Sequence, residues 1–133
     1  MDSGDDLKSL KVDDNINPHG DPFFLASSKH PDMQLVAKQF DGNNFSNWSR
    51  SVKMALGSKL KIGFIDGSCV KPAEGTADYY RWIKCDYMVI CWILNSLIPD
   101  ISESFMYVSS AKQLWDGLIE RFGQISGPLV FQL

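Results

Sequence analysis

The chain has 133 residues, of which 44% are hydrophobic and 22% charged, and its formal net charge is −3. This length suits one soluble domain that buries roughly two thirds of its unfolded surface. The acidic balance argues against a dedicated RNA or DNA binder, because such domains present a basic face and often have a high isoelectric point. One basic patch remains, since residues 46–72 carry five Lys or Arg against Asp66 alone.

The N-terminal region divides into two parts. Residues 1–20 are rich in Asp, Asn and Gly and are predicted to form a disordered tail. Residues 21–40 are predicted to form an extended arm, because Phe23, Phe24 and Leu25 stand between two prolines and have no helical period. We expect these three side chains to dock on the helical body or on a neighbouring subunit. The segment LVAKQF at its end favours either a strand or a bound extended arm.

Residues 41–133 are predicted to form a helical domain, so the fold class is mainly α with an extended N-terminal arm. The first helix begins after a cap at Asn44 or Ser46, and its apolar residues recur on one face from Trp48 to Leu56. The segment GFIDGS, residues 63–68, predicts a compact turn that carries Phe64 inward.

The longest helix is predicted between a Thr76 cap and Pro99. Its main buried stripe is expected to comprise Tyr79, Ile83, Tyr87, Ile90, Leu94 and Leu97, widened by Trp82, Val89, Trp92 and Ile93. A helix that is apolar almost all round is normally central in a bundle or at a subunit contact.

The C-terminal part predicts a short helix capped by Asp100 and a second helix that starts with the capping-box pattern Ser110 to Gln113. Gly123 is expected to end that helix in the left-handed conformation. The last residues, SGPLVFQL, predict the start of an apolar element that the chain does not complete, so the domain is expected to be truncated there. The predicted core of the whole domain comprises Trp48, Val52, Leu56, Phe64, Trp82, Ile90, Trp92, Leu94, Leu114, Trp115, Leu118 and Phe122.

The stretch from Asn43 to Leu56 admits two interpretations. Aromatic rings interleaved with cations are how single-stranded nucleic acid is often held, because bases stack on rings and phosphates pair with cations. Burying one Trp ring is worth up to ~5 kcal/mol, however, which favours the core over a stacking platform. Four basic residues are then left as candidate RNA or partner contacts: Arg50, Lys53, Lys59 and Lys61.

No catalytic or metal-binding pattern is found. The triplet Asp2-Ser3-Gly4 matches the aspartic-protease signature but has no flanking apolar strand, and His19 and His30 lie in the N-terminal region without a ligand cluster. The three cysteines have no metal-binding spacing and favour a reduced, intracellular setting. We therefore predict no enzymatic activity, no metal and no cofactor. We also predict no signal peptide and no transmembrane segment, which together favour the cytoplasm.

The order of motifs over residues 18–133 resembles the N-terminal part of plant copia-type retrotransposon Gag polyproteins. In the first half the motifs are Asp21-Pro22-Phe23-Phe24-Leu25, Gly42-Asn43-Asn44-Phe45 with Trp48-Ser49-Arg50, Lys59 to Gly67, and Lys71-Pro72. In the second half they are Trp82, Met88-Val89 with Trp92 to Ser96, Ala111, Leu114-Trp115, Leu118, Arg121-Phe122, and Gly127-Pro128 to Gln132-Leu133.

This resemblance implies a structural protein, a helical capsid-type domain that self-associates into particles around element RNA. It implies self-association as the main partnership, weak RNA contact, and neither a membrane nor a small-molecule substrate. The family's polyproteins continue with a Cys/His zinc knuckle and enzymes that this sequence does not contain. The sequence leaves open a fragment, a decayed element copy or a host-retained gene. Two other functions also stay open: a nucleic-acid-binding module using the basic patch of residues 50–71, and an inert folded remnant.

Overall fold

The fold comes from a computed structural model, which describes residues 20–25, 31 and 33–123. These residues form helices α2 (Phe45–Ser58), α3 (Gly63–Asp66), α4 (Ala77–Asn95), α5 (Pro99–Ser102), the 3-10 helix η1 (Glu103–Phe105) and α6 (Ala111–Phe122). The mainly α fold class predicted from the sequence is confirmed. The predicted tail of residues 1–20, apart from Gly20, and the apolar C-terminal residues lie outside the described part.

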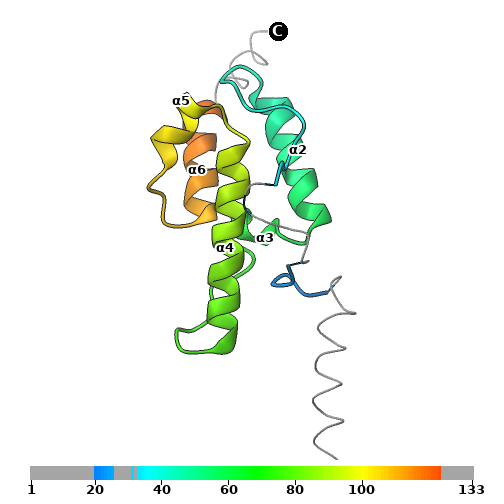
Figure 1. The fold of residues 1–133 in the computed structure, drawn as a ribbon, viewed down its shortest axis with the longest axis vertical. Helices are drawn as coiled ribbons and strands as arrows, with labels where there is room; N and C mark the ends of the chain where they lie inside the picture. The colour runs from blue at the N-terminus through cyan, green and yellow to red at the C-terminus, as the bar shows by residue number, and fades with distance from the viewer. Residues whose placement is uncertain (1–19, 26–30, 32, 124–133) are drawn as a thin grey trace, which may run out of the picture.

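Helix α4 is the central element of the fold (Figure 1). In that view α2 lies on one side of it and α5 and α6 lie on the other, while α3 sits near the end of α2. The segment before α2 is joined to the end of α4 by a parallel bridge between Phe40 and Leu97. Its two hydrogen bonds run from Phe40 N–H to the Ser96 carbonyl and from Ile98 N–H to the Phe40 carbonyl. The segment LVAKQF is therefore a bound extended segment with one bridge.

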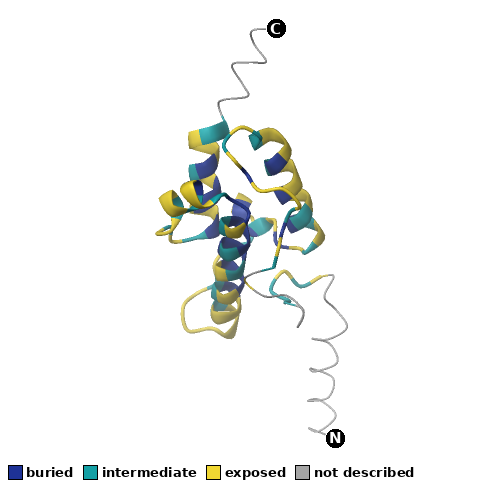
Figure 2. Cartoon of the chain, turned by 45° about the horizontal axis from the view of Figure 1, so that its top comes forward, coloured by how far each residue is buried: buried dark blue, intermediate teal, exposed yellow. Residues whose placement is uncertain are grey.

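The core lies where the inner faces of α2, α4 and α6 meet, and the buried residues follow those faces (Figure 2). All four tryptophans belong to it. Its centre is an aromatic cluster in which Trp48 stacks on Phe40 at 5.1 Å between ring centroids and lies 5.6 Å from Trp115. Ten of the twelve predicted core residues are buried, whereas Leu94 and Phe122 are only partly buried and pack on the edge of the core.

The buried face of α4 differs from the predicted stripe. Tyr87 was expected to point inward but is 63% exposed. The buried residues of α4 are Trp82, Cys85, Asp86, Val89, Ile90, Trp92 and Ile93. The buried face is rotated relative to the predicted stripe. It includes Cys85 and Asp86, a small thiol and a carboxylate that the stripe left out.

The end of α2 is a Schellman motif. Lys61 N–H donates to the Leu56 carbonyl at 2.8 Å and Leu60 N–H donates to the Gly57 carbonyl at 3.1 Å. Leu60 occupies the left-handed position, with φ of 59°, where glycine is usual. The reversal of the chain at Leu60 points Lys61 into the protein.

Two of the predicted helix starts have the expected caps. The Thr76 hydroxyl accepts from Tyr79 N–H at 3.1 Å, and the Ser110 hydroxyl accepts from Gln113 N–H at 3.0 Å. Asn44 is the N-cap residue of α2 but its side chain bonds Gln39 and Asp41 instead of the helix. At the other end of α6 the prediction was wrong, because Gly123 has right-handed helical angles.

Two further expectations are corrected in detail. The N-cap residue of α5 is Ile98, with Pro99 in the first turn, so Asp100 does not cap that helix. Within the arm, residues 21–24 form a tight turn in which Phe24 N–H donates to the Asp21 carbonyl, so this part is not fully extended.

Candidate functional site

The arm, defined here as residues 20–25, is docked on its own helical body. Phe23 lies edge-on to Phe64, with ring centroids 6.4 Å apart, and Leu25 also packs on the core. Arg81 of α4 forms an ion pair with Asp21 at 2.5 Å and places its guanidinium 5.4 Å from the Phe23 ring. Two of the three side chains predicted to dock, Phe23 and Leu25, therefore pack on the same chain.

Side chains of the helical body hold the arm by donating hydrogen bonds to main-chain carbonyls of the arm. Lys61 Nζ donates to the Phe24 carbonyl at 2.6 Å, and the thiol of Cys85 donates to the Phe23 carbonyl at 3.3 Å. The Lys61 ammonium also bonds the Lys59 carbonyl at 3.2 Å. Burial lowers the pKa of Lys61 and raises that of the Cys85 thiol, because both charged forms lose water there.

The predicted role of Lys61 as a surface contact was wrong, since its side chain is only 2% exposed. The left-handed turn at Leu60 buries it, and its charge is solvated by carbonyls instead of water. Arg50 and Lys53 do lie exposed on α2, and Lys59 is partly exposed. The basic surface is therefore smaller than the sequence indicated.

A groove runs beside the docked arm. Its volume is about 510 Å³, and it is lined by Gly20, Pro22, Phe23, Gly57, Leu60, Ile62, Gly63, Ser68, Cys69 and Val70. Three of its large apolar residues, Leu60, Ile62 and Val70, are exposed, Val70 to 76%. Because contiguous exposed apolar surface tends to mark contact sites, this groove is the strongest candidate for an interaction surface in the described part of the chain. The sequence did not single it out, because these residues follow no helical period.

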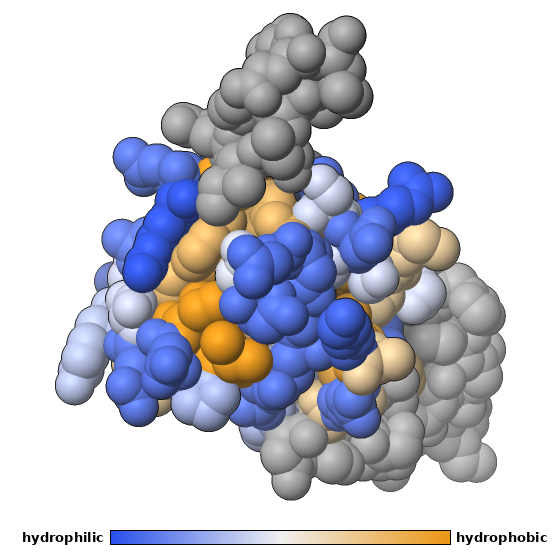
Figure 3. Space-filling model, turned by 90° about the horizontal axis from the view of Figure 1, so that it is seen from above, coloured by the Kyte–Doolittle hydropathy of each residue, from blue (hydrophilic) through white to orange (hydrophobic). Residues whose placement is uncertain are grey.

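Apolar residues also gather elsewhere on the surface. Seen from above, a small apolar area is surrounded by hydrophilic residues (Figure 3). Other large apolar residues that are exposed include Met54, Met106, Tyr107 and Ile119.

A buried carboxylate joins α4 to α6. Asp86 is 3% exposed and accepts a hydrogen bond from Ala111 N–H, at the first residue of α6, at 3.1 Å. Burial raises the pKa of Asp86, and the Ala111 hydrogen bond partly opposes that rise. The adjoining hollow of about 330 Å³ also contains Lys71, whose Nζ lies 5.8 Å from the Trp82 ring centroid. The geometry identifies Asp86 as a structural link that satisfies a free N–H at the start of α6.

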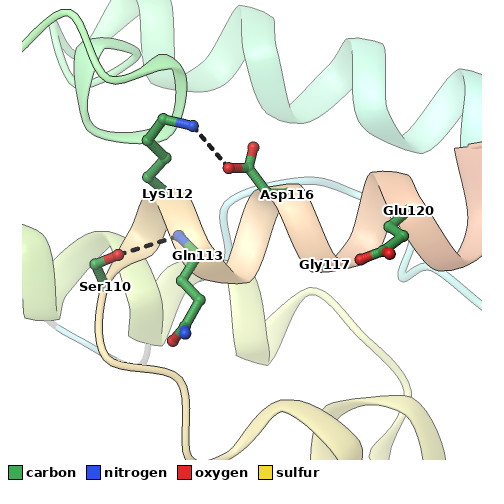
Figure 4. Close-up of a pocket in the computed structure, with 6 residues that line it drawn as sticks. All are labelled: Ser110, Lys112, Gln113, Asp116, Gly117 and Glu120. Carbon is green, nitrogen blue, oxygen red and sulfur yellow. Dashed lines mark hydrogen bonds and ion pairs between the residues drawn. The ribbon is translucent and has the colours of Figure 1, made fainter.

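A polar hollow of about 430 Å³ lies along α6 (Figure 4). Its side chains largely bond one another: Lys112 pairs with Asp116 at 2.6 Å, and the Ser110 hydroxyl accepts from the Gln113 backbone. These contacts are a helical ion pair and a helix cap, which stabilise α6 locally. They do not form an arrangement of nucleophile and base.

Among the described residues, no group of three or more His, Cys, Asp or Glu side chains is placed to hold a metal ion. The three cysteines carry free thiols. Asp2-Ser3-Gly4, His19 and His30 lie outside the described residues. Within the described ranges, no helix is both long and apolar enough to span a bilayer.

These features define a small α-helical domain that holds its own N-terminal arm beside an exposed apolar groove. Residues 26–73 match the family described as Gag-polypeptide of LTR copia-type. The match supports a copia-type retrotransposon Gag region over these residues, and the resemblance found in the sequence is confirmed.

Two relatives from Arabidopsis thaliana support this assignment. The chain is 27% identical over 110 residues to the Retrovirus-related Pol polyprotein from transposon RE1, covering 76% of this chain and 7% of that protein. It is 28% identical over 110 residues to the corresponding polyprotein from transposon RE2, covering 76% of this chain and 8% of that protein. The chain thus spans less than a tenth of these relatives. No solved structure matches it.

Proposed function

We propose that the protein is a structural Gag-type protein that acts by self-association, as a non-catalytic building block of a capsid-like particle in the cytoplasm. The observation that carries the proposal is the copia-type Gag match over residues 26–73, which covers α2, α3 and the groove residues between Gly57 and Val70. The same segment supplies Leu60, Ile62 and Val70, the exposed apolar residues that a protein contact would bury.

RNA contact is secondary in this proposal. Arg50 and Lys53 offer two exposed cations on α2, but Lys61 is committed to the arm. All four tryptophans are packed in the core, so they offer no exposed ring for a base to stack on. A weak contact that depends on phosphate charge fits this surface better than a sequence-specific one.

Self-association is tested by light scattering coupled to gel filtration and by negative-stain microscopy, over a concentration series with and without RNA. We expect the mean mass to rise with protein concentration in the absence of RNA, as small oligomers and not closed particles. Val70→Asp should weaken self-association and raise its apparent dissociation constant about tenfold, because it places a charge in the apolar contact.

The matched control is Met106→Asp, which makes the same kind of change at an exposed apolar residue away from the groove. It should leave the concentration dependence unchanged. A wild-type protein that stays monomeric across the series would contradict the proposal. Steep salt-dependent RNA binding, abolished by Arg50→Glu with Lys53→Glu, would instead favour the nucleic-acid-binding function.

A further inference from the structure

The polar contacts that hold the arm involve few of the arm's own side chains. Two of its contacts, from Lys61 and Cys85, go to main-chain carbonyls, and a third pairs Arg81 with Asp21. The side chains that make these contacts come from the end of α2 and from α4, which are far from the arm in sequence. The body therefore contains a binding site for a short acidic and aromatic peptide, Asp-Pro-Phe-Phe-Leu, and the same contacts could be made to this peptide from a second chain.

The site is also left open on one side. Pro22 and Phe23 of the arm line the groove, and Leu60, Ile62 and Val70, which also line it, remain exposed. A neighbouring body brought close by its arm would cover these residues. The chain is held on its own body again at Pro31, whose carbonyl accepts from Asn95 Nδ2 at 2.8 Å. The six positions from Leu25 to Pro31 can bridge up to roughly 21 Å.

We propose that this arm site accepts the arm of a second copy, so that two chains pair by exchanging residues 20–25. The proposal rests on the self-association proposed above and specifies its contact. A chain's own arm competes at an effective concentration in the millimolar range, so exchange becomes favourable when copies are concentrated, as they are in an assembly. Exchange of an identical element needs no new complementary surface, because the contact already exists within each chain.

The test reverses the charge of Asp21 in one variant of the full chain and the charge of Arg81 in another. Asp21→Arg places a cation opposite Arg81, and Arg81→Asp places an anion opposite Asp21, so each variant repels its own arm. In a mixture of the two variants, Asp21 of the Arg81→Asp chain meets Arg81 of the Asp21→Arg chain. The two substituted residues, which also carry opposite charges, meet at the second arm site. We expect the mixture to form a 1:1 heterodimer with an apparent dissociation constant roughly tenfold below that of either variant alone. Native mass spectrometry with one chain isotopically labelled measures it.

Two controls make the result specific. The double variant, Asp21→Arg with Arg81→Asp, restores the pair within one chain and should behave like the wild type. Lys112→Asp mixed with Asp116→Lys alters an exposed ion pair on α6, and these two variants should pair with each other no more tightly than each pairs with itself. Far-UV circular dichroism checks that every variant is folded, and both Asp21 and Arg81 are partly exposed, which keeps the core intact.

A mixture that stays monomeric while the wild type self-associates would overturn arm exchange and leave the proposed self-association standing. A mixture that pairs while the wild type is monomeric at every concentration would support the arm site and overturn self-association as the function.

Discussion

Trp48 and Trp82 allow the same substitution to be compared in two different environments. Both rings are buried, at 2% and 8% exposure. The Trp82 indole N–H donates to the Cys69 carbonyl at 3.0 Å, whereas the Trp48 indole N–H has no acceptor among the described residues. We predict that Trp48→Phe costs much less stability than Trp82→Phe.

The magnitude follows from three contributions. In each variant the smaller ring loses transfer free energy and leaves a cavity, together on the order of 2 kcal/mol. At Trp48 the substitution also removes an unpaired buried N–H, whose desolvation costs about 1–3 kcal/mol, so the net change should be within about 1 kcal/mol of zero. At Trp82 it removes a hydrogen bond worth about 1 kcal/mol and leaves the Cys69 carbonyl without that donor, for a total near 3 kcal/mol.

Urea unfolding followed by circular dichroism at 222 nm measures the difference without relying on tryptophan emission. A gap of about 3 kcal/mol corresponds to roughly 12 °C between the two melting temperatures. Equal losses in the two variants would refute the reasoning, because the hydrogen-bond state of the indole N–H would then have no energetic consequence. A larger loss for Trp48→Phe would show that its contacts with Phe40 and Trp115 outweigh the unpaired group.

Three further predictions concern stability. Trp115→Ala should cost about 3–5 kcal/mol in urea unfolding, because it empties the centre of the aromatic cluster; a near-wild-type midpoint would contradict this. Because burial raises the pKa of Asp86 above 3.8, the wild type should lose stability as pH rises from 3.8 through the folded-state pKa, and Asp86→Asn should remove that loss; parallel pH–stability curves would contradict it. Gly57→Ala should stabilise α2 by about 0.5–1 kcal/mol, since a Cβ there meets nothing within 4 Å, while Gly67→Ala should destabilise by about 1–2 kcal/mol at φ of 84°; the same sign for both would contradict the backbone argument.

The sequence was sufficient to predict the helices and most of the core. Helical spacing placed Trp48, Val52 and Leu56 on one face, and local chemistry identified the caps at Thr76 and Ser110. These features depend on neighbours within one or two turns, which a single sequence contains.

The errors arise where the decisive partner is distant in the chain. The sequence predicts Lys61 as a surface cation, whereas its burial depends on the left-handed Leu60 and the carbonyl of Phe24. Asp86 does not belong to the predicted apolar stripe of α4, and its buried carboxylate is satisfied by the N–H of Ala111. Both polar groups are buried because tertiary partners satisfy them, and hydrophobic periodicity carries no information about such partners.

The thiol of Cys85 gives the protein its own reporter of arm position. Its side chain is fully buried beneath the arm, and the raised pKa keeps it in the less reactive thiol form. A thiol reagent can therefore reach Cys85 when Phe23 has left its place, so the labelling rate reports the fraction of time for which the arm is undocked. Cys69 and Cys91 are partly exposed and supply an internal reference in the same molecule. The population of the undocked state can thus be read from peptide mass spectra of the wild-type chain.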